Sequence, residues 1–247
     1  MTQSEFDRVT RNDLDGVKKL STCLLQVSSA RWVFAAENAG AIDVQWAEAK
    51  RTNPNYFNGT IYLVDGVTIF DGALRASLLR TDFKSYLYWR LAGFPDAGVL
   101  DGFGSAIIRT QDGHIMLGRQ RMGNVNGGQA YAPAGFIDEK DVGADGIVRI
   151  DRSALREAAE ETGIDPAALE KDDGYYLTLS GAQLSIGVPL RVNMTAAEFV
   201  RRAEAHIRAT TNSELDAIIA VATPSDIENL PMPRYMRVLM DALFAGI

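Results

Sequence analysis

The sequence predicts an α+β protein made of two units, a small N-terminal lobe at residues 1–98 and a larger unit at residues 99–247. Short apolar runs bounded by glycine-containing turns occur in both units, which is typical of strands. Stretches with helical spacing of apolar residues lie between them. The segment 94–101 contains proline and glycine and is the predicted connection between the units. A chain of 247 residues is long enough to bury a sizeable core.

In the N-terminal lobe we expect a strand at 23–28 and a helix at 33–50. Strands are expected at 59–64 and 67–70, joined by Asp65-Gly66, because an Asp-Gly pair between apolar runs is a strong hairpin signal. A third strand at 73–82 follows another Asp-Gly pair, and an aromatic-rich helix is expected at 85–92. The lobe is therefore predicted to be α+β in itself.

The second unit shows the same mixture of elements. Its predicted parts are a hairpin of strands 104–109 and 114–121, strands at 175–179, 183–192 and 215–221, and helices at 195–210 and 233–244. In the helix at 195–210 the apolar residues follow a helical period, so one stripe should be buried against the rest of the unit. That stripe consists of Phe199, Val200, Ala203 and Ile207.

Composition excludes some classes of function. The chain is 47% hydrophobic and 23% charged, which is usual for globular proteins. A net charge of −7 argues against broad nucleic-acid binding, which needs a basic surface. We find no apolar run of the roughly 18 residues that span a bilayer and no leader-like start, so we expect a cytoplasmic protein that is not membrane-bound. The single cysteine, Cys23, cannot form an internal disulfide.

Three carboxylates stand out at residues 156–164, Arg-Glu-Ala-Ala-Glu-Glu-Thr-Gly-Ile. Glu157, Glu160 and Glu161 have the spacing i, i+3 and i+4, which places them on one face of a helix. Gly163 stands where a helix would end in a left-handed residue. Like charges on one face repel each other unless a cation lies among them, and Mg²⁺ prefers hard carboxylate oxygens. A solvated acidic face is the alternative interpretation.

This nine-residue run resembles the second half of the Nudix box, the metal-binding signature of the Nudix hydrolase superfamily. The resemblance implies a Nudix αβα sandwich for the second unit and a Mg²⁺ cofactor, or Mn²⁺, held by Glu157, Glu160 and Glu161. It also implies that Arg156 holds the box loop through a salt bridge. The implied activity is metal-dependent hydrolysis of a diphosphate bond.

The first half of the box departs from the family pattern. Residues 131–138, Tyr-Ala-Pro-Ala-Gly-Phe-Ile-Asp, resemble the turn that opens the box, with Gly135 as its glycine. Gly135 and Arg156 are 21 positions apart, seven more than the pattern, and residues 142–150 read as an inserted loop or hairpin. Asp141 stands where the family has a glutamate that pairs with the box arginine. Glu139 and Asp145 are the alternatives for this position.

Further site residues are expected around the box. By resemblance, Glu214 is a candidate general base along with Glu157. Arg119 and Arg121, two residues apart in a predicted strand, share one face, and guanidinium groups suit phosphate oxygens. Surface salt bridges are the alternative for both arginines. Tyr131, next to the box turn, is expected to line the pocket or to pack in the core.

The substrate class follows from the resemblance only in outline. A nucleoside diphosphate linked to another moiety is expected, in the first place a nucleotide sugar such as UDP-glucose or ADP-ribose. Residues 53–59 and 88–90 resemble the Nudix branch that cleaves UDP-glucose. The N-terminal lobe is then expected to determine substrate specificity, to form a dimer interface or to serve only as a structural cover. A Nudix-fold module that binds nucleotides without hydrolysing them is the alternative function.

Overall fold

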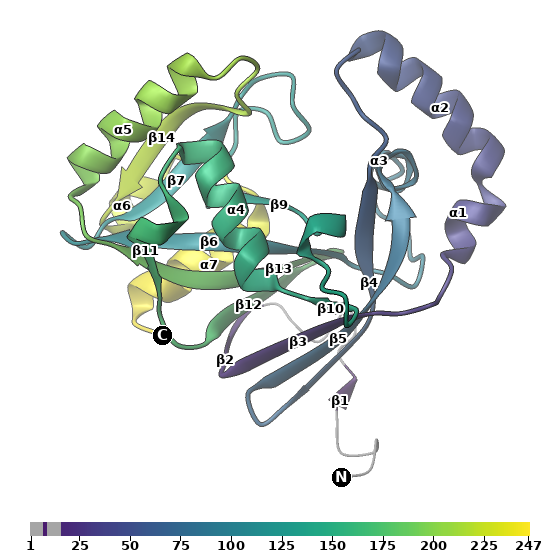
Figure 1. Cartoon of the computed structure of the whole chain (residues 1–247), viewed down its shortest axis with the longest axis horizontal. Coiled ribbons are helices and arrows are strands. Elements are labelled where there is room, and N and C mark those ends of the chain that lie inside the picture. Colours follow the sequence, from purple (N-terminus) through teal and green to yellow (C-terminus); the bar gives the residue numbers. More distant parts are fainter. Residues whose placement is uncertain (1–6, 9–15) are drawn as a thin grey trace.

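The computed structural model describes residues 7–8 and 16–247 of the chain, and in these residues it contains two β-sheets and seven α-helices. The two sheets lie in two lobes, with the helices α1 to α3 in one and α4 to α7 in the other (Figure 1). The predicted α+β class is confirmed. Within the described ranges, none of the helices is long and apolar enough to cross a membrane.

The first sheet belongs mainly to the N-terminal lobe. Its strand order is β1 (Asp7–Arg8), β4 (Thr60–Phe70), β5 (Ala73–Asp82), β3 (Thr22–Val27) and β10 (Ile147–Val148). Only β3 and β5 pair in parallel among these strands. The helices α1 (Val33–Glu37), α2 (Ala39–Thr52) and α3 (Phe83–Leu91) belong to this lobe. Buried aromatic and aliphatic side chains join α3 to the sheet, which makes this lobe a packed unit.

The second sheet is larger and runs in the order β14 (Leu215–Val221), β7 (Ile115–Gln120), β6 (Asp101–Thr110), β13 (Gln183–Val192), β12 (Tyr175–Ser180) and β2 (Gly16–Leu20). Three short strands pair beside this path, β8 (Ala130–Tyr131), β9 (Ala134–Phe136) and β11 (Leu169–Lys171). Short 3₁₀ turns occur at Glu139–Asp141 and Pro166–Ala168.

Helices cover both faces of the second sheet. On one face, α4 (Ile150–Thr162) and α5 (Ala196–Ala209) pack against Ala106 and Ile108 of β6. On the other face, α7 (Arg234–Ala245) packs against Phe103 and Ile107, the alternate residues of the same strand. The short helix α6 (Pro224–Ile227) precedes α7. This arrangement is the αβα sandwich that the sequence predicts, and the apolar stripe of α5 faces its core.

The two lobes share strands. The strand β2 comes from the N-terminal segment but pairs with β12 in the second sheet. Conversely, β10 comes from the box loop and pairs with β3 at the edge of the first sheet, with Val148 opposite Leu25. One buried cluster includes Leu25, Val148 and Leu184, so a continuous apolar core runs through both lobes.

Two local predictions are wrong. Asp65-Gly66 does not form a hairpin, because β4 continues through it with a register irregularity between Val64 and Gly66. The turn lies at Asp71-Gly72, where both residues have positive φ, as tight hairpin turns require. The helix expected at 33–50 is interrupted at Asn38, whose side chain donates to the carbonyl of Phe34 and competes with the helical hydrogen bonds.

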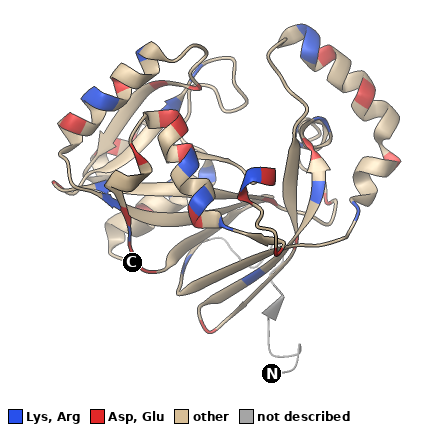
Figure 2. Cartoon of the chain, in the orientation of Figure 1, with Lys and Arg blue, Asp and Glu red and all other residues tan. Residues whose placement is uncertain are grey.

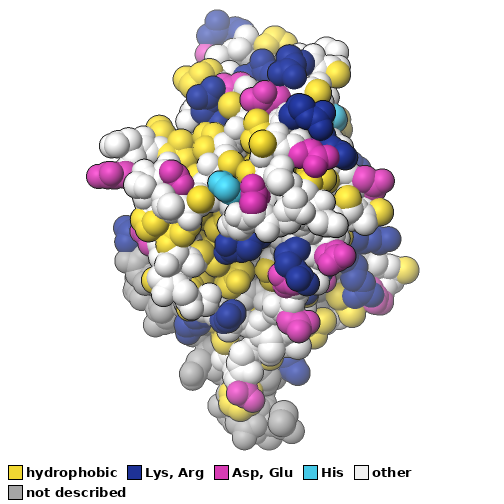
Figure 3. All heavy atoms as spheres, turned by 90° about the vertical axis from the view of Figure 1, so that its left-hand side faces the viewer, with side chains coloured by type: hydrophobic (Ala, Val, Ile, Leu, Met, Phe, Trp, Pro, Cys, Tyr) yellow, Lys and Arg dark blue, Asp and Glu magenta, His cyan; other side chains and the backbone are white. Residues whose placement is uncertain are grey.

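Charged side chains are interspersed by sign over the surface that Figure 3 shows, on the α5 side of the molecule. Along α5 itself, Arg202 pairs with Glu198 and Arg208 with Glu204. Acidic and basic residues also follow one another along α4 (Figure 2). Basic side chains on the visible face therefore stand beside acidic ones and do not form a separate basic stripe.

Candidate active site

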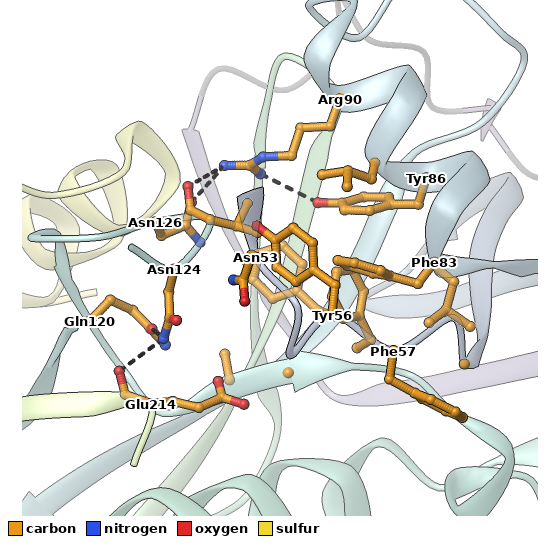
Figure 4. A pocket seen from close by; sticks show the side chains of 18 of the residues that line it. Asn53, Tyr56, Phe57, Phe83, Tyr86, Arg90, Gln120, Asn124, Asn126 and Glu214 are labelled. Atoms are coloured by element: carbon orange, nitrogen blue, oxygen red, sulfur yellow. Dashed lines mark hydrogen bonds between the residues drawn. The ribbon is translucent and has the colours of Figure 1, made fainter. Parts of the chain in front are cut away.

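A cleft of about 1370 Å³ lies between the two lobes. One wall consists of α4, the box turn and the segments 120–126 and 212–214, and the other consists of α3 and the segment 45–61. Figure 4 shows the aromatic side chains of the N-terminal lobe facing Gln120, Asn124 and Glu214 across this space. Most ligand pockets measure roughly 300–1,000 Å³, so the cleft has room for an extended molecule.

Arg156 ties α4 to the box loop. Its guanidinium donates to Asp141 at 3.0 Å and to Glu157 at 2.6 Å, and lies 4.0 Å from Asp138. Asp141 is only 2% exposed, and it also accepts a hydrogen bond from the backbone of Asp138. Burial lowers the pKa of Arg156, but Glu157, Asp141 and Asp138 outweigh this effect, so the pKa is raised. Arg156 is therefore a fixed, permanently charged anchor for the loop.

The other two acids considered for this position lie elsewhere. Glu139 pairs with Arg80 of the first sheet at 2.8 Å, and Asp145 pairs with Arg149 at 2.7 Å. The inserted residues after Asp141 turn outward, form β10 and join the first sheet. The insertion thus leaves the arginine anchor intact and uses its extra length to connect the box to the N-terminal lobe.

The box glutamates lie together at the end of α4 and at the edge of the cleft. Burial raises the pKa of Glu157 to about 7; the neighbouring charge of Arg156 lowers it, and Glu160 and Glu214 raise it. Glu160 has a 56% exposed side chain and lines the cleft. The charge of Glu214, which is distant in sequence, raises the pKa of both Glu157 and Glu161, so these three carboxylates belong to one electrostatic environment.

Glu161 is the most deeply buried of the three. It is 6% exposed, and within the described residues neither of its carboxylate oxygens has a hydrogen-bond partner. Burial raises its pKa well above the ordinary value, and repulsion from Glu157 and Glu214 adds to this. The backbone of Ala134 lowers the pKa in part but does not reach hydrogen-bond geometry. An uncompensated carboxylate of this kind requires either a proton or a cation.

Gly135 is required by the position of Glu157. A Cβ atom at residue 135 would stand 2.3 Å from the Glu157 carboxylate, much closer than van der Waals contact allows. Gly135 lies in β9, which pairs with β6 through Gly104. The box turn therefore presents bare backbone to the carboxylate of α4.

Replacing Gly135 by alanine should move the Glu157 carboxylate without unfolding the protein, because the obstructed atoms are the end of a flexible side chain. We expect a loss of Mg²⁺-dependent stabilisation in thermal melts, with the melting temperature in EDTA almost unchanged. The control is Gly16→Ala, because a Cβ atom at residue 16 meets no other atom within 4 Å. Gly113→Ala is not suitable, because the positive φ of Gly113 would strain an alanine. Equal Mg²⁺ stabilisation in the Gly135→Ala protein and the wild type would contradict this account.

Gly163 ends α4 in the left-handed conformation, with φ of 69°. A Cβ at this position would also lie 2.5 Å from the ring of His206 on α5. The His206 ring contacts the Glu160 carbonyl at 2.9 Å, so it satisfies a carbonyl in the last turn of α4. Gly163 and His206 thus have structural roles that hold the glutamate-bearing turn in place.

Glu214 is positioned through its backbone. Its carbonyl accepts hydrogen bonds from the Arg121 backbone at 2.8 Å and from the Asn124 side chain at 3.2 Å. Asn124 also donates to Gln120, as Figure 4 shows. Glu214 itself is exposed and lines the cleft.

The two arginines of the β7 region have different surroundings. Arg119 pairs with Asp216 at 2.6 Å and is not among the residues that line the cleft. Arg121 lines the cleft, but its side chain donates to the carbonyls of Ser213 and Leu215. Tyr131 also lines the cleft and is 6% exposed; burial raises its pKa, and Glu161 and Glu214 raise it further.

Sequence reasoning missed a polar chain that connects the lobes at the cleft. Arg90 donates to Asn126 at 2.7 Å and to the Tyr86 hydroxyl at 3.3 Å (Figure 4). Tyr86 in turn donates to Asp101 at 2.9 Å. These residues come from α3, β6 and the loop after β7. Arg90 belongs to the segment 88–90 that the sequence singles out, but no sequence signal marks Tyr86, Asp101 or Asn126 as its partners.

Asp101 is expected to make the stability of the protein depend on pH. Burial raises its pKa from 3.8 to about 6, although Tyr86, Arg90 and Gln183 lower it. Between these pH values the folded state keeps a proton that the unfolded state releases, so stability falls as the pH rises. We expect the stability of the wild type relative to Asp101→Asn to decrease between about pH 4 and pH 6. Urea unfolding of both proteins at pH 4, 5, 6 and 7 tests this, and a constant difference would disprove it.

No family model matches the sequence, and no curated protein matches it. Solved structures do resemble the chain. They include the Nudix hydrolase RenU from M. smegmatis, with a TM-score of 0.40, 14% identity and coverage of 57% of this chain and 82% of that one. MutT from Methanosarcina mazei Go1 has a TM-score of 0.40, 19% identity and coverage of 58% and 91%. A C. elegans Ap4A hydrolase has a TM-score of 0.41, 13% identity and coverage of 60% and 100%. Two of the solved structures that resemble this chain, RenU and a protein from Alicyclobacillus acidocaldarius, are described as Nudix hydrolases.

Proposed function

We propose that the protein is a metal-dependent hydrolase of the diphosphate bond in a nucleoside diphosphate linked to another moiety, such as the nucleotide sugars UDP-glucose and ADP-ribose. The observation that carries this proposal is the buried Glu161 carboxylate without a hydrogen-bond partner, next to Glu157 and Glu160 at the edge of a large cleft. Arg156 pairs with Glu157 at 2.6 Å and with Glu160 at 3.4 Å, so Glu161 is the carboxylate of the three that the described residues leave uncompensated. A buried charge without a partner is costly, and a cation would compensate it.

The donor set suits a hard divalent cation. Carboxylate oxygens are the ligands of Mg²⁺ and Mn²⁺, and Glu157, Glu160 and Glu161 are the residues that would hold the ion. Within the described part of the chain no three acidic, histidine or cysteine side chains already converge as a metal-binding group. Glu157 is turned to Arg156 at 2.6 Å, so binding requires this carboxylate to rotate. When bound, the ion would neutralise diphosphate charge and lower the pKa of a water molecule.

The protein groups have separate tasks in this proposal. Arg156 keeps the helix and the box loop in register through Asp141. Glu214 is favoured over Glu157 as the base that accepts the proton of water, because Glu157 is engaged with Arg156 whereas Glu214 is exposed to the cleft. The fixed backbone of Glu214 limits the positions that its carboxylate can reach.

Phosphorus NMR of the purified protein with Mg²⁺ in ¹⁸O-labelled water tests the activity. The panel contains UDP-glucose, ADP-ribose, GDP-mannose, NADH, a diadenosine polyphosphate and an oxidised deoxynucleoside triphosphate. We expect one compound to give two monophosphates, with the label showing which phosphorus is attacked. Tight binding of one compound without turnover would instead favour a nucleotide-sensing module.

A further inference from the structure

The two walls of the cleft differ in chemistry. The α4 wall and the box turn contribute most of the charged lining residues. In the segments 45–61 and 83–91 of the opposite wall, Glu48 and Arg90 are the only charged residues that line the cleft. A diphosphate and its cation match the first wall, whereas a neutral part of the same ligand matches the second.

Tyr56 provides an aromatic surface on the second wall. Its ring stacks on Trp46 at 15° with a centroid separation of 6.4 Å and meets Phe83 edge-on at 5.6 Å. Tyr56 and Phe83 line the cleft, whereas Trp46 does not, so Trp46 supports the Tyr56 ring from behind. Figure 4 shows the Tyr56 and Phe83 rings beside each other in the cleft.

The segment that carries Tyr56 is held in place. Lys50 donates to the Tyr56 carbonyl at 2.8 Å, and Asn58 donates to Asp82 at 3.1 Å while accepting from the Lys84 backbone at 2.8 Å. A binding surface fixed before the ligand arrives loses less entropy on binding. Phe57, the next residue, also lines the cleft and is 81% exposed, although a large apolar side chain gains from burial.

Side-chain amides accompany the aromatic surface. Gln45 lines the cleft, and its side-chain oxygen is buried without a hydrogen-bond partner in the described structure. Asn53 also lines the cleft, and its oxygen accepts from the backbone of Asn55. Amide groups both donate and accept hydrogen bonds, as the edges of nucleobases do.

We infer that the N-terminal lobe binds the nucleobase of the substrate, stacked on Tyr56 with Phe57 at its edge, while the diphosphate lies at α4. This inference rests on the proposed function, because it places the two ends of a nucleoside diphosphate on the two walls. It makes the N-terminal lobe the substrate-specificity unit. A base fits better than a sugar because both of its faces are flat and uncharged and its edge matches the amides.

Metal-free binding tests the subsite separately from hydrolysis. Full-length protein in EDTA is titrated with AMP, GMP, CMP, UMP and glucose 1-phosphate by isothermal titration calorimetry. We expect one nucleoside monophosphate to bind and Tyr56→Ala to raise its Kd about tenfold or more, whereas Tyr56→Phe keeps the affinity. The surface variant Glu198→Gln on α5 should bind like the wild type. Circular dichroism melts establish that each variant is folded.

Trp46 provides an independent signal. Its stacking on Tyr56 means that a bound base should change its fluorescence, and Trp46→Phe should remove this change while binding persists in calorimetry.

Binding of glucose 1-phosphate in place of every nucleoside monophosphate would overturn the inference, as would binding of none of the probes or equal affinity in Tyr56→Ala. Base binding that depends on Tyr56 without turnover of any diphosphate would uphold the subsite and reject the hydrolase. Turnover with an unchanged KM in Tyr56→Ala would uphold the hydrolase and reject the nucleobase subsite.

Discussion

Replacing Glu160 and Glu161 together by glutamine is expected to abolish hydrolysis and, at the same time, to stabilise the metal-free protein. The two substitutions remove a buried carboxylate that has no hydrogen-bond partner and a neighbouring charge that repels Glu157. Stabilisation of phosphoryl transfer by metal ions is worth several kcal/mol, so turnover should fall by roughly a thousandfold or more. Activity with the cleaved panel compound and thermal melts with EDTA or Mg²⁺ measure both effects.

The gain in stability has a predictable pH dependence. Because the pKa of Glu161 is raised in the folded state, its ionisation weakens the fold increasingly as the pH rises. The variant should therefore exceed the wild type in melting temperature by more at pH 8 than at pH 5, and Mg²⁺ should stabilise only the wild type. The matched control is Glu198→Gln/Glu204→Gln on α5, which removes two exposed i, i+4 pairs. Retained turnover in the Glu160→Gln/Glu161→Gln protein would exclude the proposed metal site.

Replacing Arg156 by methionine is expected to cause the largest loss of stability among the site variants, about 3–5 kcal/mol in the free energy of unfolding. Methionine preserves much of the apolar stem, but Asp141, 2% exposed, would be left as a buried charge without its guanidinium partner. Glu157 would also lose the cation that lowers its pKa. Urea unfolding at pH 7 measures the loss.

The control for Arg156 is Arg149→Met. Arg149 pairs with Asp145 at a similar distance, but both side chains are about half exposed, so the expected loss is below about 1 kcal/mol. The double variant Arg156→Met/Asp141→Asn should be more stable than the sum of the two single losses predicts, because it removes both charges of the pair. Additive losses would mean that Arg156 and Asp141 do not interact in solution.

Local patterns predicted most of the elements. The stripe of α5 and the end of α4 at Gly163 follow from residues three or four positions apart, which the helix itself brings together. The two Asp-Gly pairs show the limit of this reasoning. Both carry the same turn signal, yet only Asp71-Gly72 turns the chain, because pairing with β5 on both sides of Asp65 keeps β4 continuous.

In the candidate site, too, the sequence predicted mainly the relations between residues that are close together in the chain. The spacing of the three glutamates predicts that they share a helical face, which fits a solvated acidic surface as well as a cation site. The resemblance of residues 156–164 to the Nudix box favoured the cation site. The resemblance to the box favoured Asp141 as the acid opposite Arg156, with Glu139 and Asp145 as alternatives, and the structure confirms Asp141. The 3₁₀ turn at Glu139–Asp141 buries only Asp141 and points it at Arg156.

By itself the sequence determined the helix that carries the carboxylates, its arginine and its terminal glycine, because these depend on short-range geometry. Only the tertiary structure decided that the inserted box residues form β10 on the first sheet, that Glu214 lines the same cleft as Glu157 and Glu160, and that Tyr56 lies on the opposite wall of this cleft. These relations join segments far apart in the chain. They arise from strand pairing and core packing between the lobes, which no local pattern of residues encodes.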